Sequence, residues 1–339
     1  MDFMIYGAYG YTGELCAELA VAKGMRPLLA GRSAARLKAV ADRLSLQARA
    51  FDLSKPDLRG VGLVLHCAGP FSQTSKAMVD ACLAAQAHYL DVTGEVAVFE
   101  SVLSRDAEAK ARGIVLLPGV GFDVVPSDCL AATLKSKLPS ATALELAFAP
   151  MGRSSPGTLK TSIESFPQGG LVRRDGRLTK VPAAFEVRTV PFHDKPRTAM
   201  TVPWGDLATA FRSTGIPNIT VFMSAKPSVI RAARMSRLTG PLLGLPFVQR
   251  FLKRRIEQRV KGPDAGERAR GKAEFWGRAT DGGKSVELTM TVPEGYSLTA
   301  EAALECARRV MAGEVKPGAW TPSLAFGAGF AASLPGVRV

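Results

Sequence analysis

Histidine and paired cysteine are scarce in this chain, and their scarcity argues against the usual metal-binding classes. Its 339 residues include three histidines and five cysteines, and no two cysteines form a C-x-x-C pair. Zinc sites are built from clusters of these residue types, so the sequence predicts no metal. The odd number of scattered cysteines favours reduced thiols in a cytoplasmic setting. The cysteines are Cys16, Cys67, Cys82, Cys129 and Cys306.

Long apolar runs, low-complexity tracts and internal repeats are also missing. No uninterrupted apolar stretch reaches the ~18–20 residues that a membrane-spanning helix requires. The first expected strand begins within a few residues of Met1, so we expect no signal peptide. A hydrophobic content of 47% with 22% charged residues is typical of a globular protein, and the length fits two domains.

A glycine turn near the start of the chain is the strongest functional signal. An apolar run at 3–6 precedes it and a helical pattern follows it, which is the context of a dinucleotide-binding motif. Gly7 permits the tight turn, Gly10 lets the backbone approach a pyrophosphate, and Gly13 lets the helix pack close to the strand. The helix N-terminus would then bind the phosphates. The spacing is G-x-x-G-x-x-G, and the residues assigned to this turn are Gly7, Ala8, Tyr9, Gly10, Tyr11, Thr12 and Gly13.

The end of the next strand indicates which dinucleotide is bound. The run 27–30 leads into Gly31, Arg32 and Ser33, where an NAD enzyme would place an acidic residue for the ribose 2′-hydroxyl. A guanidinium can hold a 2′-phosphate through charge-assisted, bidentate hydrogen bonds, and Arg36 follows one helical turn later. The sequence therefore predicts NADP(H) as the cofactor. The alternative is that both arginines are solvent-exposed side chains at the start of a helix and bind no ligand.

The alternation of strands and helices continues to about residue 120 and predicts a Rossmann-type, doubly wound α/β domain with a parallel sheet. The expected strands lie at 48–51, 61–65, 88–92 and 114–118, with helices at 75–85 and 96–112. Asp52, at the end of one strand, could accept a hydrogen bond from the adenine amino group. His66 ends an apolar strand, where a packed role is more common than a catalytic one. Three small residues leave room for the nicotinamide side of the cofactor: Ala68, Gly69 and Pro70.

Several segments in the same order resemble one known family, the saccharopine dehydrogenase-like group. The branch is the one that contains trans-acting enoyl reductases and animal saccharopine dehydrogenase-like oxidoreductases. The resemblance covers about the first 130 residues, and 318–322 resembles the family's closing segment. It implies an NADP-binding oxidoreductase, but members act on very different substrates. The segments that carry the resemblance are 7–13, 29–32, 68–71, 89–95 and 118–128.

No signature acid–base pair stands out, and no Y-x-x-x-K pair of the short-chain reductase kind is present. Candidates are therefore chosen by position, at the carboxyl ends of the late strands, where substrate meets cofactor. Glu95 and Asp123 are the preferred pair for contact with substrate or with the nicotinamide amide. Alternatively, Glu95 lies in the first turn of a helix, and Ser127 or Asp128 caps the next one. The full set of candidates is Asp91, Glu95, Asp123, Ser127 and Asp128.

A second domain with a different pattern is expected after a helix at 127–138. Strands at 143–148, 272–280 and 285–292 and a hairpin at 171–178 predict a mostly antiparallel sheet covered by helices. A strong helix at 298–311, with Ser297 or Thr299 as its cap, and a final helix at 321–334 complete the chain. We expect an NADP-binding domain at 1–135, an α+β substrate or interaction domain at 136–315, and a segment at 316–339 that returns to the first domain. A homodimer through the second domain is a further expectation.

A basic, apolar stretch stands out in the second domain. The net charge is +14, and residues 226–275 contribute thirteen Lys or Arg against four Asp or Glu. Gly240-Pro241 and Leu245-Pro246 should break 229–260 into two helical pieces. These pieces could lie peripherally on an anionic membrane, line a pocket for a phosphate or an acidic carrier, or simply pack on the protein surface. Aromatic residues are sparse there, which argues against nucleic acid.

The predicted function is an NADPH-dependent oxidoreductase that reduces an enoyl or carbonyl group of an acyl or lipid-like substrate. Two alternatives stay open. One is an amino-acid adduct dehydrogenase of the saccharopine type. The other is a non-catalytic NADP-binding protein that associates with membranes through 229–260. NADP(H) is the expected cofactor, and a small-molecule or acyl substrate is the expected partner of the enzyme.

Overall fold

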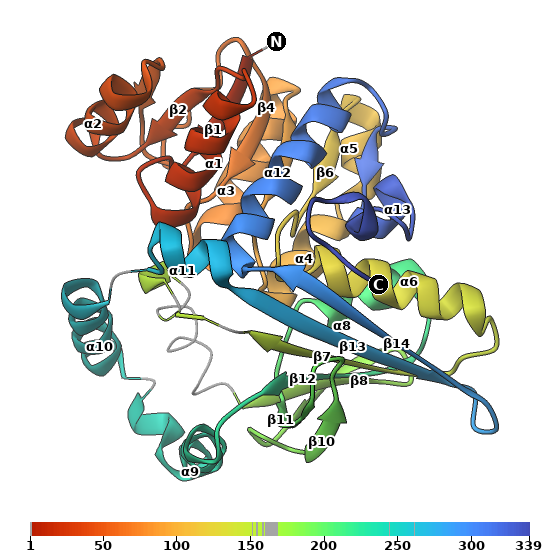
Figure 1. Cartoon of the computed structure of the whole chain (residues 1–339). Helices are drawn as coiled ribbons and strands as arrows, with labels where there is room; N and C mark the ends of the chain where they lie inside the picture. Colours follow the sequence, from red (N-terminus) through yellow and green to blue (C-terminus); the bar gives the residue numbers. More distant parts are fainter. Residues whose placement is uncertain are drawn as a thin grey trace. The chain divides into compact units, whose positions relative to one another are not determined.

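Two compact units make up the chain (Figure 1). The computed structural model describes residues 2–150, 152–153, 155–157, 159, 169–243, 245–260 and 262–339. The first unit combines Met1–Val125 with Tyr296–Pro335, and the second combines Pro126–Gly295 with Gly336–Val339. These limits differ from the domain bounds expected at 135 and 315, because the helix expected at 298–311 clusters with the first unit.

A parallel sheet of seven strands forms the centre of the first unit, as predicted. Its strand order is β15-β6-β5-β4-β1-β2-β3, and neighbouring strands in it run parallel to one another. The described residues of β1 and β4 are buried along their whole length, as expected for central strands covered on both faces. This is the predicted Rossmann-type topology. The strands are β1 (Asp2–Tyr6), β2 (Leu28–Gly31), β3 (Ala48–Ala50), β4 (Val61–His66), β5 (His88–Asp91), β6 (Val115–Leu117) and β15 (Gly318–Ala319).

Helices connect these strands, with two corrections to the predicted set. The single helix predicted at 96–112 is two helices, α4 and α5, separated at 104–105. The final helix predicted at 321–334 stops at Phe326, because Gly327 has a φ of +87° that a helix cannot accommodate. The helices are α1 (Tyr11–Ala22), α2 (Ala34–Leu44), α3 (Phe71–Ala85), α4 (Val96–Leu103), α5 (Asp106–Arg112), α12 (Gly295–Met311) and α13 (Pro322–Phe326), followed by a 3₁₀ turn at Ala331–Ser333.

The second unit is built on a mixed sheet of eight strands that is mostly antiparallel. The order is β10-β11-β12-β7-β13-β14, with β8 paired to β12 and β9 to β8, and the β12–β7 pair is parallel. The predicted hairpins at 171–178 and 272–292 are present, whereas β10 to β12 were not predicted. The strands are β7 (Ala143–Pro150), β8 (Gly170–Arg174), β9 (Arg177–Val181), β10 (Val187–Pro191), β11 (Pro196–Thr201), β12 (Asn218–Ser224), β13 (Lys272–Thr280) and β14 (Ser285–Pro293).

Of the two helix breaks predicted in the second unit, one is absent and the other is present. The break predicted at Gly240-Pro241 is wrong, because α9 continues to Leu243. The break at Leu245-Pro246 is confirmed, and Pro246 opens α10 at a position where no backbone donor is needed. Gly244, within the predicted basic segment, lies outside the described residues. The helices are α6 (Val125–Lys137), α8 (Asp206–Thr214), α9 (Pro227–Leu243), α10 (Pro246–Arg259) and α11 (Ala265–Arg270).

Helix α12 begins earlier than predicted. It starts at Gly295, so Ser297 and Thr299 lie inside its first turns and neither is the cap that was expected. The Thr299 hydroxyl instead accepts a hydrogen bond from Phe122 N at 3.0 Å. In the part of the chain that the structure describes, no helix is both long and apolar enough to cross a bilayer.

Candidate functional site

The glycine turn between β1 and α1 has the geometry expected of a phosphate-binding turn. Gly7 has a φ of +88°, and its N–H donates to Ala30 O on β2 at 2.8 Å. Gly10 N–H then donates to Gly7 O at 2.9 Å and closes the turn. Gly10 is the N-cap of α1, and no side chain in the described structure caps that helix. The positive end of α1 is therefore left for an anion.

Close packing at the turn explains why two of its positions are glycine. A Cβ on Gly13 would lie 2.3 Å from Gly7 O, which no side chain can tolerate. A Cβ on Gly7 would lie 2.9 Å from the Ala68 Cβ at the end of β4. These contacts confirm the tight-turn role of Gly7 and the close-packing role of Gly13. The approach of a pyrophosphate to Gly10 remains a prediction.

Tyr9 organises the end of β2, a role that the sequence did not reveal. Its ring occupies the space above Gly31, where an added Cβ would lie 2.6 Å from the ring. Ser33 N–H donates to the Tyr9 hydroxyl at 3.3 Å, and the Arg36 guanidinium lies 4.5 Å from the ring centroid. Arg36 also donates to Tyr9 O at 3.3 Å. Ser33 and Arg36, two of the residues assigned to the 2′-phosphate, thus contact the glycine turn through Tyr9.

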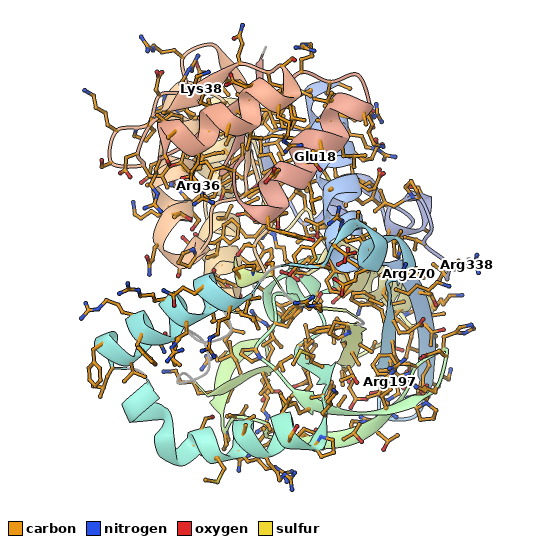
Figure 2. All side chains as sticks on the ribbon, turned by 60° about the vertical axis from the view of Figure 1, so that its left-hand side comes forward. Glu18, Arg36, Lys38, Arg197, Arg270 and Arg338 are labelled. Carbon is orange, nitrogen blue, oxygen red and sulfur yellow. The ribbon has the colours of Figure 1, made fainter. Side chains whose placement is uncertain are left out.

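The charge at the end of β2 is positive and open to solvent. Arg32 is exposed and makes no ion pair with any residue that the structure describes. Arg36 is likewise exposed on α2, where Figure 2 labels it together with Lys38. No acidic residue lies at the β2 end, at the position where an NAD enzyme carries one. The Ser33 hydroxyl caps α2 by accepting from Arg36 N at 3.4 Å.

Asp52 follows β3 on the same edge of the sheet. Its carboxylate is exposed and accepts a hydrogen bond from Ser54 N at 2.9 Å. Hydrogen bonds from Ser54, with a smaller contribution from the Arg32 charge, lower the pKa of Asp52 below its usual value. The carboxylate therefore stays ionised and can still accept from an adenine amino group, which keeps that assignment as a prediction.

His66 is a packed residue, in line with the more common interpretation of its position. It is fully buried at the end of β4, with the rings of Tyr6, Phe71 and Tyr89 around it. Burial lowers its pKa to about 3, so the imidazole is neutral. Its Nε2 lies 3.0 Å from the hydroxyl of Thr74, which itself donates to Ala68 O at 2.8 Å. His66 and Thr74 therefore support the 68–70 loop.

Asp91 is buried at the end of β5 and holds two loops together. Its carboxylate accepts hydrogen bonds from the Tyr89 hydroxyl at 2.7 Å, from Thr93 N at 3.0 Å and from Gly119 N at 2.8 Å. Burial outweighs these bonds and raises the pKa of Asp91 to about 6. With its oxygens occupied, Asp91 positions the ends of β5 and β6 and does not serve as an open acid or base.

Glu95 lies just before a helix and not in its first turn, and its carboxylate accepts two backbone hydrogen bonds. It is the N-cap residue of α4, and its side chain reaches across to the start of α3. There it accepts hydrogen bonds from Phe71 N at 2.8 Å and Ser72 N at 3.0 Å. Glu95 thus stabilises the N-terminus of α3 directly after the Ala68-Gly69-Pro70 loop. This arrangement favours a positioning role over the proposed contact with substrate.

Asp123 lies in the loop between β6 and α6 and keeps the properties of an acid–base group. Its carboxylate packs against the backbone of Gly94, where an added Cβ would lie 2.8 Å from Oδ2. Burial raises the pKa of the Asp123 carboxyl group to about 7. Part of the residue is still exposed to solvent. A carboxyl group that titrates near neutral pH can donate and accept a proton under physiological conditions.

Ser127 and Asp128 belong to the second unit and are fully or almost fully buried in the first turns of α6, which begins at Val125. They are therefore not the N-caps that were expected. Asp128 accepts a hydrogen bond from the Ser213 hydroxyl at 2.7 Å. That contact anchors α8 within the second unit, so Asp128 has a structural role.

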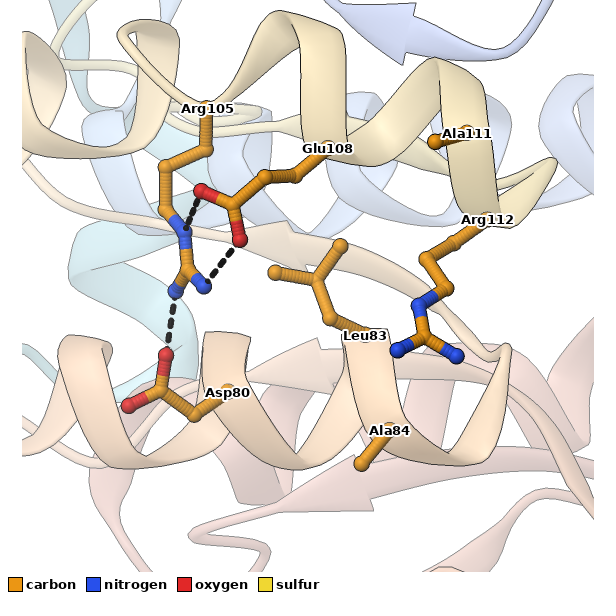
Figure 3. Close-up of a pocket in the computed structure, with 7 residues that line it drawn as sticks. All are labelled: Asp80, Leu83, Ala84, Arg105, Glu108, Ala111 and Arg112. Atoms are coloured by element: carbon orange, nitrogen blue, oxygen red, sulfur yellow. Dashed lines mark hydrogen bonds and ion pairs between the residues drawn. The ribbon is translucent and has the colours of Figure 1, made fainter.

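Hollows elsewhere on the first unit do not compete with the glycine turn as a cofactor site. One of about 370 Å³ lies between α3 and α5 (Figure 3). Three of its charged side chains already pair with one another, since Arg105 bridges Asp80 and Glu108. None of the residues predicted to bind the cofactor lines it. Among the described residues, no three His, Cys, Asp or Glu side chains gather as metal ligands.

Comparison with known proteins agrees with this geometry. A family model described as the saccharopine dehydrogenase NADP binding domain matches residues 3–117. A protein of Mycobacterium tuberculosis (strain ATCC 25618 / H37Rv), provisionally named a trans-acting enoyl reductase, is 36% identical over 140 residues, covering 38% of this chain and 33% of the relative. The trans-acting enoyl reductase of Mycobacterium leprae (strain TN) is 34% identical over 140 residues, covering 38% of this chain and 34% of the relative. The matches span about a third of the length of these relatives.

The fold also has a solved counterpart. Apo histidine-tagged saccharopine dehydrogenase (L-Glu forming) from Saccharomyces cerevisiae superimposes with a TM-score of 0.65, covering 97% of this chain and 95% of the yeast chain. The sequence identity is 11%, so this likeness concerns the fold alone. The segment matched by the family model contains the glycine turn, the β2 end and the 68–70 loop. Residues 3–117 are therefore similar to the saccharopine dehydrogenase NADP binding domain, which supports a nicotinamide cofactor for this part of the chain.

Proposed function

We propose that this protein is an NADPH-dependent oxidoreductase that reduces an enoyl or carbonyl group of an acyl or lipid-like substrate. The observation that carries the proposal is the basic end of β2, where Arg32 and Arg36 are exposed beside Tyr9 and Ser33. A carboxylate at this position would repel a 2′-phosphate, whereas two guanidinium groups and a helix N-terminus attract it. The cofactor preferred over NADH is therefore NADPH.

Different residues of the first unit would bind different parts of this cofactor. The turn at Gly10 and the N-terminus of α1 would hold the pyrophosphate. Arg32 and Ser33 would contact the 2′-phosphate, with Arg36 held nearby by Tyr9. The 68–70 loop, supported by Thr74 and Glu95, would border the nicotinamide side.

Asp123 is the residue we assign to proton transfer. Bound NADPH supplies a hydride, which would add to the β-carbon of an enoyl group or to a carbonyl carbon. The reduction is completed by a proton on the α-carbon or on the carbonyl oxygen. A carboxyl group with a pKa of about 7 is suited to deliver that proton at neutral pH.

The substrate class is supported by two features of different kinds. Relatives that are 33–36% identical over 140 residues are named trans-acting enoyl reductases, and that shared stretch covers 38% of this chain. The second unit also exposes several apolar side chains on α9 and α10, including Phe247 and Phe251. An acyl chain is a better match for such a protein than a substrate with several carboxylates.

The test is a substrate panel with both reduced cofactors. We expect α,β-unsaturated acyl thioesters to be reduced with oxidation of NADPH, and Asp123→Asn to lower kcat by about 100-fold or more while it leaves NADPH binding intact. Turnover of an amino-acid adduct but of no thioester would replace the proposal with a saccharopine-type reaction. Tight NADPH binding with no reduction of any substrate would indicate a non-catalytic protein.

A further inference from the structure

Helix α10 exposes two phenylalanines one turn apart. Phe247 is 63% exposed and Phe251 is 57% exposed, although phenylalanine is normally a core residue. Leu252 and Ile256 on the opposite side of the helix are partly buried, so that side faces the protein. In an ordinary surface helix the large apolar side chains face the protein core. Phe247 and Phe251 face away from the core, so they do not serve that packing role.

Arginines flank this aromatic ridge on both sides. At 3.6 residues per turn, Arg250 and Arg254 lie on one flank of the two phenylalanines, and Arg255 lies on the other. All three arginines are exposed. The guanidinium of Arg255 lies 5.3 Å from the centroid of the Phe251 ring. We call Phe247, Arg250, Phe251, Arg254 and Arg255 the α10 face.

The positive charge of the α10 face is not neutralised by the residues that the structure describes. None of its arginines forms an ion pair with a described residue, whereas arginines elsewhere do, such as Arg105 with Asp80. Residues 226–259 contain nine Lys or Arg and one Asp or Glu. An external anionic surface is the complement that this charge requires.

The preceding helix, α9, has the same mixture on its outer side. Ile230 and Ala233 are buried against Met200, which fixes the inner side of α9. Val229 and Met235 are exposed, with Met235 at 59%, and Arg231 and Arg234 are exposed as well. Figure 1 shows α9 and α10 following one another in the second unit. The basic and apolar surface therefore extends beyond one helix.

We propose that the α10 face, together with the exposed side chains of α9, binds an anionic lipid bilayer. Phe247 and Phe251 enter the interface between headgroups and acyl chains, while the flanking arginines contact lipid phosphates. On this helix an apolar ridge lies between two basic flanks. In an anionic bilayer the charged headgroups lie above the hydrocarbon, so the ridge can insert while the flanks stay among the headgroups. An acidic protein would complement the arginines but gives no reason for the exposed ridge. The same exposed phenylalanines also support the acyl substrate class proposed above, but vesicle binding is measured without cofactor or substrate, so the two proposals can fail separately.

The experiment uses the full chain without cofactor and vesicles of phosphatidylcholine with or without phosphatidylserine. We expect co-flotation with the phosphatidylserine vesicles only, and partial retention at high salt because the phenylalanines remain inserted. The double variant Phe247→Ser/Phe251→Ser should lose about tenfold or more in vesicle affinity. Arg250→Gln/Arg254→Gln should lose about tenfold, and its remaining binding should no longer depend on salt as steeply.

The matched control changes two exposed lysines elsewhere in the second unit. Lys180→Gln/Lys284→Gln removes the same charge as the arginine variant and should leave vesicle binding unchanged. Circular dichroism and thermal unfolding of each variant establish that it is folded. Equal binding to neutral vesicles, or equal losses in the lysine control, would overturn the proposal. So would binding to polyglutamate without binding to vesicles, which would identify an acidic protein as the partner.

Discussion

Glu95 holds the backbone of Phe71: one carboxylate oxygen accepts from Phe71 N at 2.8 Å, and the other accepts from Ser72 N at 3.0 Å. The two residues lie on neighbouring strand-to-helix connections, after β5 and after β4. Their contact fixes the loop at 68–70 with respect to β5. The loop expected to border the nicotinamide therefore depends on a carboxylate that we first considered for catalysis.

The first prediction separates the positioning role of Glu95 from a catalytic one. Glu95→Ala leaves two helix N–H groups without their acceptor, so we expect the free energy of unfolding to fall by about 1–2 kcal/mol. NADPH affinity should fall with it, because the 68–70 loop loses its anchor. Glu95→Gln keeps an acceptor and should lose less of both. Denaturant unfolding and calorimetry measure these effects.

A catalytic Glu95 would behave differently. The alanine variant would then bind NADPH and unfold like the wild type, yet lose one limb of the pH–rate profile. That result would reverse the assignment.

The second prediction concerns the choice of cofactor. Arg32→Ala removes an exposed cation from the end of β2, and we expect NADPH affinity to fall by about 10- to 100-fold, since charge-assisted bonds to a phosphate contribute roughly 1.5–3 kcal/mol. NADH affinity should change little. Lys38→Ala, an exposed cation on the same helix as Arg36, is the control. Equal losses for both cofactors would remove Arg32 from 2′-phosphate recognition.

Local features of the site were predictable because nearby residues determine them. The turn at Gly7–Gly13 follows from glycine spacing between a strand and a helix, and the basic β2 end follows directly in the sequence. The predicted hairpin at Asp175-Gly176 is present because that turn requires positive φ at both residues. The sequence could place such features without knowledge of the rest of the molecule.

Features that depend on distant residues were not predictable. The acceptor for Phe71 N belongs to a residue 24 positions away. Phe122 N donates to Thr299, which is 177 positions away and was expected to cap its own helix. The role of Tyr9 over Gly31 also depends on the packing of two separate turns. Only the assembled sheet brings such pairs together.

The third prediction tests the phosphate turn. Gly10 has a φ of −83°, which any residue can adopt, and an added Cβ would lie 3.2 Å from Gly7 O, so Gly10→Val requires only a small shift of the turn. Its side chain would project where a pyrophosphate is expected, and we expect the binding of NADPH and NADH to be lost together. Gly329→Ala is the control, since a Cβ there meets no neighbour within 4 Å. Calorimetry with both cofactors measures the effect, and unchanged binding would place the phosphates elsewhere.

The fourth prediction uses the pH dependence of Asp123. Its pKa is raised to about 7 in the folded protein, against roughly 3.9 for an unperturbed Asp. As the pH rises, Asp123 therefore loses its proton in the unfolded chain at a lower pH than in the folded protein. The contribution of Asp123 to stability is present below about pH 4 and is lost as the pH rises to about 7. Asp123→Asn should remove this loss and raise Tm at alkaline pH.

The same protonation governs the reaction. If Asp123 donates the proton in the reductive direction, kcat should fall as the pH rises through about 7, and Asp123→Asn should abolish that limb. Asp91→Asn is the contrasting variant, because Asp91 accepts three hydrogen bonds and an amide cannot accept them all in place. It should lower Tm at every pH. A decrease in Tm for Asp123→Asn at alkaline pH, equal to that of Asp91→Asn, would show that Asp123 is a structural carboxylate and not the proton donor.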